Sequence, residues 1–423
     1  MLRRSLLTTL GAGLALTGML AGTARAEIAP ETAGTYAAGW LGRTMDPTGY
    51  VPSLGGADYS TTAYAVLALV AAEVGEAQAA EATSYLFAHV EEFVSPDADD
   101  VPGALALLIL VGEARGLDTS SLVTRLLATK RTTGDDAGLF GSQDATYDGT
   151  YRQALALLAL DAAGTTDADA VAWLVGEQCS DGGWMGNRPE GAECPAFDFN
   201  TFVGEDSNGT ALATQALVAL GETPAHDALD FLAEAQNDDG GFAFVPGFDS
   251  DANSTALAIQ ALIALGEDLG DWAAPDGTPY DFLLSLQLGN PPAATAGALA
   301  FQPGSPLKAN AFATAQAVPA LMGKPYPIQQ ATLASTLPLL PAAPVATPSA
   351  TVAPTAAPVP SVTPSAAPTR VVRPAPVPEL PATGGVGEKP WDATGQVVFG
   401  LGLVGYGVLA MGGATWARRR AVR

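Results

Sequence analysis

The chain has 423 residues, of which 19 are Lys or Arg, 44 are Asp or Glu and 2 are Cys, and its formal net charge is −25. Hydrophobic residues make up 48% of the chain and charged residues 15%, which excludes a wholly disordered protein. Residues 27–369 hold 9 basic and 41 acidic residues, a net charge of −32, so their surface would repel a phosphate backbone. We therefore expect no nucleic-acid partner.

The first 26 residues have the pattern of a secretory signal. Arg3 and Arg4 precede an apolar run from Leu6 to Leu20, and small residues follow at Ala24-Arg25-Ala26. This order of charged, apolar and small residues is typical of signal peptides. We expect 1–26 to be removed and the protein to be exported.

A helical repeat occupies residues 27–337. The segment from Thr210 to Leu220 is repeated, with few changes, from Thr255 to Leu265. Weaker copies of this segment begin near Thr62, Pro102, Thr150 and Asn310. All six segments are apolar almost all round, which indicates buried inner helices.

Six amphipathic segments alternate with the apolar ones and carry the charges that an outer layer needs. They lie near 33–45, 77–93, 118–130, 167–178, 224–236 and 278–287. Six inner and six outer helices in strict alternation predict an all-α fold, the (α/α)6 toroid. A closed double ring leaves no inner helix exposed at an end, unlike the alternative, an open helical array.

Two turns of the repeat share one spacing: a Gln, three residues, Gly-Gly and an aromatic residue. Their members are Gln178, Gly182, Gly183 and Trp184 in the first turn and Gln236, Gly240, Gly241 and Phe242 in the second. Glycine can adopt the left-handed conformation that ends a helix. This pattern resembles the glutamine–tryptophan repeats of squalene and terpenoid cyclases and of protein prenyltransferase β subunits. The resemblance implies the toroid fold and a structural role for the turns.

An acidic motif, Asp97-Ala98-Asp99-Asp100, precedes one predicted inner helix. Cyclases of the resembling family protonate their substrate with the middle Asp of an Asp-x-Asp-Asp motif, so the resemblance implies Asp99 as a general acid beside Asp97 and Asp100. The family motif continues with Thr-Ala, whereas this chain has Val101-Pro102. The alternative role is helix capping, because other predicted inner helices also open with an acid. Those acids, at the predicted mouth of the toroid, are Asp58, Asp148, Asp206 and Asp251.

Cys179 and Cys194 are the only cysteines and flank a loop rich in Gly and Pro. In an exported protein they predict a disulfide, which would stabilise the fold by about 3 kcal/mol on chain-entropy reasoning. The prenyltransferases bind zinc through Asp, Cys and His, but His89 and His226 both fall on predicted outer helices. We therefore expect no metal site and no cofactor. Cobalamin is one ligand to consider, since cobalamin carriers use the same double ring.

A spacer follows the repeat region, over residues 338–379. It contains 12 Pro among Ala, Val, Ser and Thr, and almost no aromatic or charged residues. Such a composition cannot form a core and favours an extended, disordered stalk.

The last segment, 380–423, has the order of a cell-surface anchor. It begins with the motif Leu380, Pro381, Ala382, Thr383 and Gly384. An apolar stretch at 396–417 follows, long enough to span a bilayer, and an arginine-rich tail ends the chain. This arrangement resembles the LPxTG sorting signal of Gram-positive surface proteins. It implies that a sortase cleaves after Thr383 and joins the protein to a peptidoglycan precursor, so that a membrane-bound form precedes the wall-anchored one.

These features together predict a wall-anchored toroid at the cell surface that binds a ligand or a surface partner without catalysis. Two alternatives belong to other classes. The first is a terpenoid or squalene cyclase-like isomerase or lyase, or another lipid-modifying enzyme, that uses the Asp97–Asp100 motif. The second is a cobalamin-binding module.

Overall fold

The computed structural model describes residues 28–53, 55–141, 148–188, 194–198, 201 and 203–342. The predicted signal peptide, the sorting motif at Leu380–Gly384 and the apolar stretch 396–417 lie outside these residues, as does the stalk from 343 on. No helix within the described ranges has the length and apolar character needed to cross a membrane.

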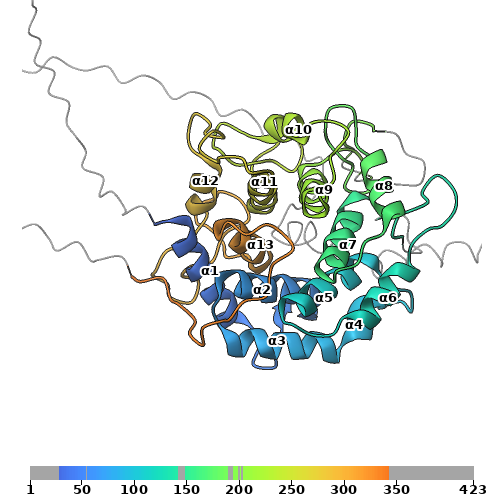
Figure 1. Cartoon of the computed structure of the whole chain (residues 1–423). Coiled ribbons are helices and arrows are strands. Elements are labelled where there is room, and N and C mark those ends of the chain that lie inside the picture. The colour runs from blue at the N-terminus through green and yellow to red at the C-terminus, as the bar shows by residue number, and fades with distance from the viewer. Residues whose placement is uncertain are drawn as a thin grey trace, which may run out of the picture.

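Six helices form an inner ring, which Figure 1 views nearly end-on. They are α2 (Tyr59–Ala72), α5 (Pro102–Ala114), α7 (Thr150–Ala162), α9 (Ser207–Leu220), α11 (Ala252–Leu265) and α13 (Ala311–Leu321). Each packs against the next in chain order, and α13 packs against α2. The described residues therefore form a closed ring, and no inner helix lies at an open end of an array.

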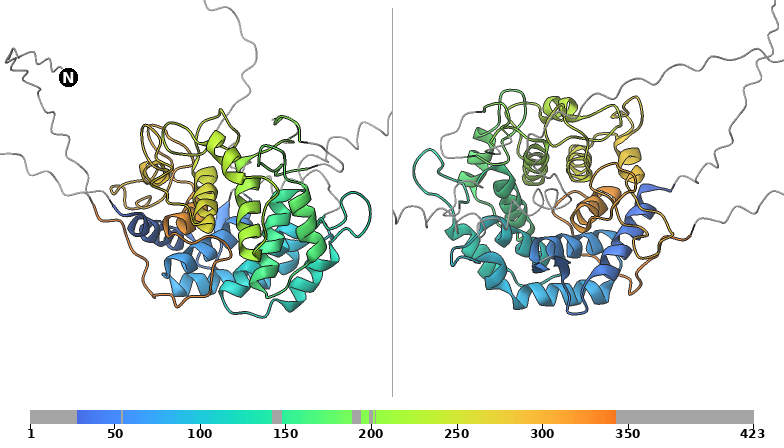
Figure 2. Two further views of the ribbon diagram at one scale, coloured as in Figure 1. Left: turned by 45° about the horizontal axis from the view of Figure 1, so that its top comes forward. Right: turned by 180° about the vertical axis from the view of Figure 1, so that it is seen from behind.

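The other helices of the described residues surround the ring, and Figure 2 shows them from two further sides. They are α1 (Pro30–Thr44), α3 (Glu76–Ala88), α4 (Val90–Val94), α6 (Ser120–Ala128), α8 (Ala168–Gly176), α10 (Ala228–Ala235) and α12 (Pro279–Ser285). The predicted outer segment 77–93 is divided into α3 and α4 at His89, whose φ of −121° and ψ of 38° leave the helical region. A short antiparallel hairpin of β1 (Val51–Ser53) and β2 (Gly56–Asp58) precedes α2.

The Gly-Gly turns set how closely each outer helix approaches the previous repeat. Gly182 has a φ of +95°, and a Cβ there would lie 2.0 Å from the carbonyl oxygen of Asp227, just before α10. A Cβ on Gly183 would lie 2.6 Å from the ring of Phe231 in α10. Because only glycine leaves this space, the two glycines allow α10 to pack directly on the turn. These contacts give Gly182 and Gly183 a part in packing α10 on the turn.

One side chain in each of five inner helices fastens that helix to the turn before it. These clamp residues accept a hydrogen bond from a backbone N–H of the turn at 2.8–3.0 Å; they are Thr62, Gln153, Thr210, Thr255 and Thr314. The bonds are buried, so each satisfies a donor that water cannot reach. The clamp residues also give a common register for comparing the inner helices.

A glutamine at the end of each of three outer helices joins neighbouring repeats. Gln178 donates from Nε2 to the carbonyl oxygens of Gly182 and His226. Gln287 makes the equivalent pair of bonds, to Gly297 at 3.1 Å and to Ala33 at 2.9 Å. Since Ala33 belongs to α1, Gln287 connects the last repeat to the first. The turn after Gln287 is longer than those after Gln178 and Gln236, which is why the sequence spacing did not reveal it.

The chain after α13, residues 322–340, crosses the end of the ring at which the inner helices finish, and we call this segment the strap. Its first residues contact α11 and α9 through Gln260 and Gln215. Farther along, the Ala334 N–H donates to Glu73 beyond the end of α2. Leu340 is 2% exposed, so packed chain continues past the expected boundary at 337.

Candidate functional site

The aspartates predicted at the ring mouth lie where the inner helices begin, and three of the four cap a helix. Asp206 accepts from the Gly209 N–H at 2.7 Å, and Asp251 accepts from Ser254 at 2.9 Å. Asp58 accepts from Thr61 at 2.9 Å. Asp148 differs, because the N-cap of α7 is Gly149 and makes no side-chain hydrogen bond.

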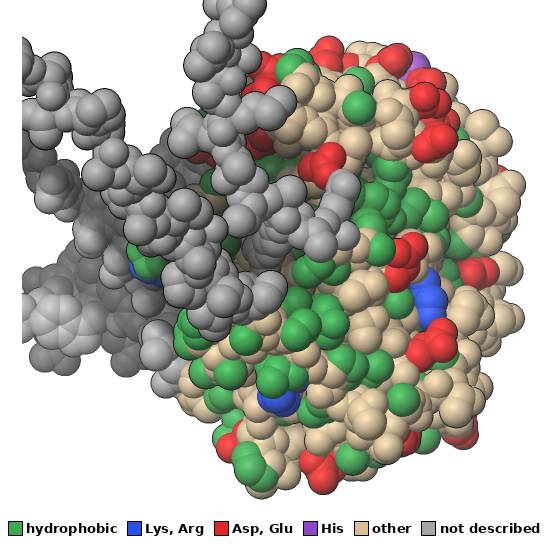
Figure 3. Space-filling view, turned by 90° about the vertical axis from the view of Figure 1, so that its left-hand side faces the viewer, with side chains coloured by type: hydrophobic (Ala, Val, Ile, Leu, Met, Phe, Trp, Pro, Cys, Tyr) green, Lys and Arg blue, Asp and Glu red, His purple; other side chains and the backbone are tan. Residues whose placement is uncertain are grey.

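Asp148 belongs instead to a buried ionic network that the sequence analysis did not anticipate. Its fully buried carboxylate lies 2.8 Å from Arg131 and 3.1 Å from Arg152. Arg131 also pairs with Asp136 at 2.9 Å, and Asp136 pairs with Arg188 at 2.6 Å. Opposite charges at these distances compensate one another inside the protein. The protein has many more acidic than basic residues, and basic side chains are sparse on the face that Figure 3 shows. The buried network nevertheless contains three of the protein's arginines.

The Asp97–Asp100 motif lies between α4 and α5, at the molecular surface. Asp97 and Asp99 are exposed. Asp100 accepts from Arg125 on the outer helix α6, at 2.6 Å, and this bond lowers the pKa of Asp100. The N-cap residue of α5 is Val101, which makes no side-chain hydrogen bond. The motif thus neither supplies the N-cap of α5 nor holds Asp100 as a protonated acid.

Asp206 and Asp251 are the buried acids at the ring mouth that cap their helices without an arginine partner among the described residues. Burial raises the pKa of Asp206 to about 7, although the backbone N–H groups of Gly209, Gly186 and Asn208 favour the charged form. Burial likewise raises the pKa of Asp251 to about 6. The charge of Asp206 also acts on Tyr151, whose pKa is raised mainly by its own burial. Asp206 therefore lies close enough to the ring interior to influence its polar groups.

These buried acids predict that stability falls as pH rises. Between about pH 4 and pH 7 the folded state holds protons on Asp206 and Asp251 that the unfolded chain has released. The free energy of unfolding should fall between pH 5 and pH 7, by up to about 1.4 kcal/mol per pH unit for each fully protonated group. Asp206→Asn should reduce this slope in urea unfolding, whereas exposed Asp118→Asn should not. An unchanged slope in Asp206→Asn would contradict the assignment.

Three tyrosines lie together inside the ring, and sequence analysis did not single them out. The hydroxyls of Tyr64 and Tyr151 are 3.1 Å apart, and Gln316 donates from Nε2 to Tyr151 at 3.5 Å. Tyr326, from the strap, is 4% exposed. Burial, followed by the nearby tyrosines, raises the pKa of Tyr64 and of Tyr326. All three hydroxyls therefore stay neutral and can donate hydrogen bonds throughout the physiological pH range.

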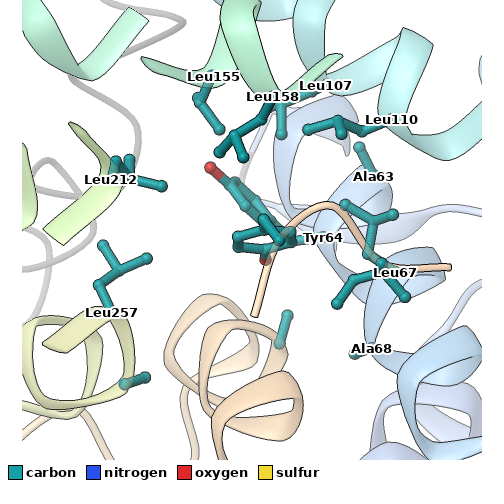
Figure 4. Packing of buried hydrophobic residues seen from close by; sticks show 14 of the residues in the cluster. Ala63, Tyr64, Leu67, Ala68, Leu107, Leu110, Leu155, Leu158, Leu212 and Leu257 are labelled. Carbon is teal, nitrogen blue, oxygen red and sulfur yellow. The ribbon is translucent and has the colours of Figure 1, made fainter. Parts of the chain in front are cut away.

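Leucines surround this polar centre in a regular layer. Counted from the clamp residues, Tyr64, Leu155, Leu212, Leu257 and Gln316 occupy one equivalent position, two residues after each clamp. Figure 4 shows Tyr64 in the ring interior, with the leucines of α7, α9 and α11 pointing toward the same region. The repeat would allow an entirely apolar layer, and two of its five compared members are polar instead.

Several buried polar atoms in the ring have no hydrogen-bond partner among the described residues. They include the Tyr326 hydroxyl and Gln260 Oε1 near the strap, and Asn208 Oδ1 and Asn253 Oδ1 near the opposite mouth. Buried polar atoms are costly to leave unpaired and are normally satisfied by protein, water or ligand. The ring interior can thus offer both hydrogen-bond donors and acceptors to a ligand within apolar walls.

Cys179 and Cys194 form the predicted disulfide, with Cα atoms 6.0 Å apart. The carboxylate of Glu205 lies beside the two sulfur atoms. Burial, followed by its hydrogen bond with Asp181, raises the pKa of Glu205 to about 8. Because the sulfur atoms are bonded to each other, they offer no thiolates to a metal ion.

No family model and no curated protein matches the sequence. Three solved structures resemble the fold. A type II terpene cyclase, MstE from Scytonema, in complex with geranylgeranyl dihydroxybenzoate, is 14% identical at a TM-score of 0.49 and covers 70% of this chain and 97% of its own. A protein from Actinoplanes is 15% identical at a TM-score of 0.45, and the match covers 70% of this chain and 99% of the Actinoplanes chain. Candida albicans protein geranylgeranyltransferase-I, complexed with GGPP, is 11% identical at a TM-score of 0.41, and the match covers 61% of this chain and 82% of the transferase chain. The first and the third of these solved structures are thus a terpene cyclase and a protein prenyltransferase, and the likeness concerns the fold.

Proposed function

We propose that the toroid is the ligand-binding head of an exported surface protein and that it binds without catalysis. The observation that supports this most is the polar centre of Tyr64, Tyr151 and Gln316 within leucine walls. Its chemistry suits a largely apolar ligand that carries a hydroxyl, carbonyl or amide group. The apolar body would contact the leucines, and the polar group would pair with the tyrosines and glutamines.

The positions of the acids argue against general acid catalysis. A general acid needs a proton on an oxygen that faces the substrate. Asp97 and Asp99 are exposed, and Asp100 is paired with Arg125. Asp206 uses Oδ1 to accept from Gly209 and Oδ2 to accept from Gly186. None of these carboxyls is placed to protonate a ligand among the ring tyrosines.

A cyclase-like enzyme is the second candidate, and one observation favours it. Burial raises the pKa of Asp206 to about 7, and the charge of Asp206 acts on Tyr151, so an acid that can hold its proton near neutrality lies within electrostatic range of the polar centre. If a ligand drew one carboxyl oxygen away from its backbone donors, Asp206 could deliver that proton. This candidate places the acid at Asp206 instead of Asp99.

Native mass spectrometry of the full exported chain from its producing cells distinguishes these candidates. We expect a co-purifying, largely apolar molecule with at least one oxygen or nitrogen function. The conservative variants Tyr151→Phe and Gln316→Leu should lower its occupancy about tenfold, since each removes a buried hydrogen bond worth about 1–1.5 kcal/mol. Gln329→Leu, an exposed change on the strap, is the matched control.

Enzyme activity would give a different result. Turnover of squalene or a linear polyprenyl diphosphate that persists in Asp99→Asn and disappears in Asp206→Asn would support the second candidate and reject binding without catalysis. A co-purifying corrinoid would instead identify the cobalamin-binding alternative.

We also propose that the segment 380–423 attaches this head to the cell wall through Thr383, at the end of the 338–379 stalk. The support is the sequence order of motif, apolar stretch and arginine tail. Thr383→Ala should leave the protein in the membrane fraction, because the acyl link to peptidoglycan forms at that residue. Ala382→Gly, at the variable position of the motif, serves as the control. Wall attachment that survives Thr383→Ala would reject sorting.

A further inference from the structure

The strap enters the ring at the mouth where the inner helices end. The backbone N–H of Tyr326 donates to Gln215 Oε1 at 3.0 Å, and Gln260 Nε2 donates to the carbonyl of Lys324 at 3.0 Å. The Tyr326 side chain is 4% exposed and is buried in the same core cluster as Tyr64 and Tyr151. The strap therefore occupies part of the interior that a ligand would need.

The two glutamines that hold the strap lie at a repeat position that α2 and α7 fill with leucine and α13 with Pro319. Gln215 and Gln260 each follow their clamp residue by five positions, and the residues equivalent to them in α2 and α7 are Leu67 and Leu158. A leucine there would serve a purely apolar core. The change to glutamine in α9 and α11 provides the only described side-chain partners of the strap backbone at Lys324 and Tyr326.

The fit of the strap inside the ring is incomplete. Among the described residues, neither the Tyr326 hydroxyl nor Gln260 Oε1 has a hydrogen-bond partner, and both atoms are buried. Burying polar groups without partners opposes the closed position. A ligand with its own donors and acceptors would satisfy the ring groups that the strap leaves unpaired.

The rest of the strap is attached by few bonds. The main chain of 329–340 bonds residues 73–76 three times: Ala334 N–H to Glu73, Glu76 N–H to Ala334, and Gly75 N–H to Thr336. Arg43 and Asn290 add side-chain bonds to Pro338 and Leu340. The strap contains no helix, so it lacks the continuous hydrogen bonding of the inner helices, and it is held by these bonds and by the buried side chains of Ile328 and Leu333.

We propose that the strap is an internal occupant of the ligand site, which closes this mouth of the ring with Tyr326 and must detach before a ligand enters. The proposal rests on the proposed function, because it describes how access to the same interior is controlled. Ligand affinity is then reduced by the population of the closed strap, so a change that opens the strap raises affinity without altering the ring.

A covalent lock tests this mechanism in the full chain. Val74 and Ala334 pair in a parallel bridge, so Val74→Cys with Ala334→Cys should form a disulfide that holds the strap in place. The probe is Nile red, a neutral apolar dye whose fluorescence rises on burial. We expect the locked chain to take up the dye at least tenfold more slowly than the parent. Tyr326→Ala should take it up at least tenfold faster.

Controls separate the lock from its side effects. The lock is present under oxidising conditions and absent under reducing ones, which also reduce the native Cys179–Cys194 disulfide. The single variant Val74→Cys, measured under both conditions, shows the effect of reducing the native disulfide alone. Equal uptake by the locked, parent and Tyr326→Ala chains would overturn the strap proposal while retaining a binding site in the ring. Absence of uptake by every chain, Tyr326→Ala included, would count against the proposed binding function.

Hydrogen exchange tests strap opening without any ligand. We expect the amide of Glu76, which donates to the strap, to exchange at least a hundredfold faster than amides in the middle of α9. The lock should slow Glu76 and leave α9 unchanged. Equal protection of Glu76 and α9 in the parent chain would mean that the strap opens only with global unfolding, and the proposal would be wrong.

Discussion

Replacement of Trp184 by Ala is expected to lower the free energy of unfolding by about 3–5 kcal/mol, because it removes the largest fully buried side chain of the described core. The indole donates from Nε1 to the Leu174 carbonyl at 2.8 Å, so the change also leaves a buried acceptor unpaired. Reversible urea unfolding at constant pH measures the loss.

Leu117→Ala is the control for this prediction. Leu117 is 40% exposed, so its truncation should change the free energy of unfolding by less than about 0.5 kcal/mol. Trp184→Phe keeps most of the volume and loses the hydrogen bond, and it should fall between the two. If Trp184→Ala costs no more than Leu117→Ala, the aromatic turn does not hold its repeat together.

Asp148→Asn should destabilise the fold by about 3–5 kcal/mol, although the two side chains have nearly the same shape. Asp148 is fully buried and compensates Arg131 and Arg152. Removing its charge leaves two guanidinium groups without this partner in a region that water reaches poorly. The loss should be measured by urea unfolding at one fixed pH for both chains.

Two controls distinguish a buried network from a surface ion pair. Glu73→Gln removes a pair with Lys324 in which the two side chains are 56% and 37% exposed, and it should cost less than about 1 kcal/mol. Asp58→Asn should cost a few tenths of a kcal/mol, because Asn caps a helix nearly as well as Asp. If Asp148→Asn costs no more than these two variants, Asp148 does not compensate a buried ionic network.

Arginine pairing explains why the acidic residues of the sequence divided into different roles. From the sequence, Asp58, Asp148, Asp206 and Asp251 looked alike, because each precedes an apolar helix. Asp148 alone has Arg131 and Arg152 within 3.1 Å, and these come from a preceding loop and from α7 itself. The sequence offered no signal for this difference, since pairing across 17 residues depends on how the loop folds.

The sequence alone determined the helical repeat, the alternation of inner and outer helices and the disulfide between Cys179 and Cys194. These properties follow from local rules. Apolar residues all round a helix require burial on every side, and two lone cysteines beside one short loop have few alternatives. The glycine turns were also recognisable, because a left-handed backbone in a crowded place needs glycine wherever it occurs.

Only the tertiary structure decided what lies at the centre of the ring. The residues at this centre are Tyr64, Tyr151, Gln316 and Tyr326. Apart from Gln316 and Tyr326, which are close in sequence, they lie 87 or more positions from one another, and nothing in their local sequence patterns relates them. Ring closure through Gln287 and Ala33 brings the ends of the repeat together, and the strap then reaches the interior. The Asp97–Asp100 motif was recognisable from its sequence, but the sequence did not indicate that Asp97 and Asp99 are exposed at the surface. The residues of the polar centre are far apart in the sequence, and they meet only when the whole chain closes and packs. Local propensity does not determine such contacts.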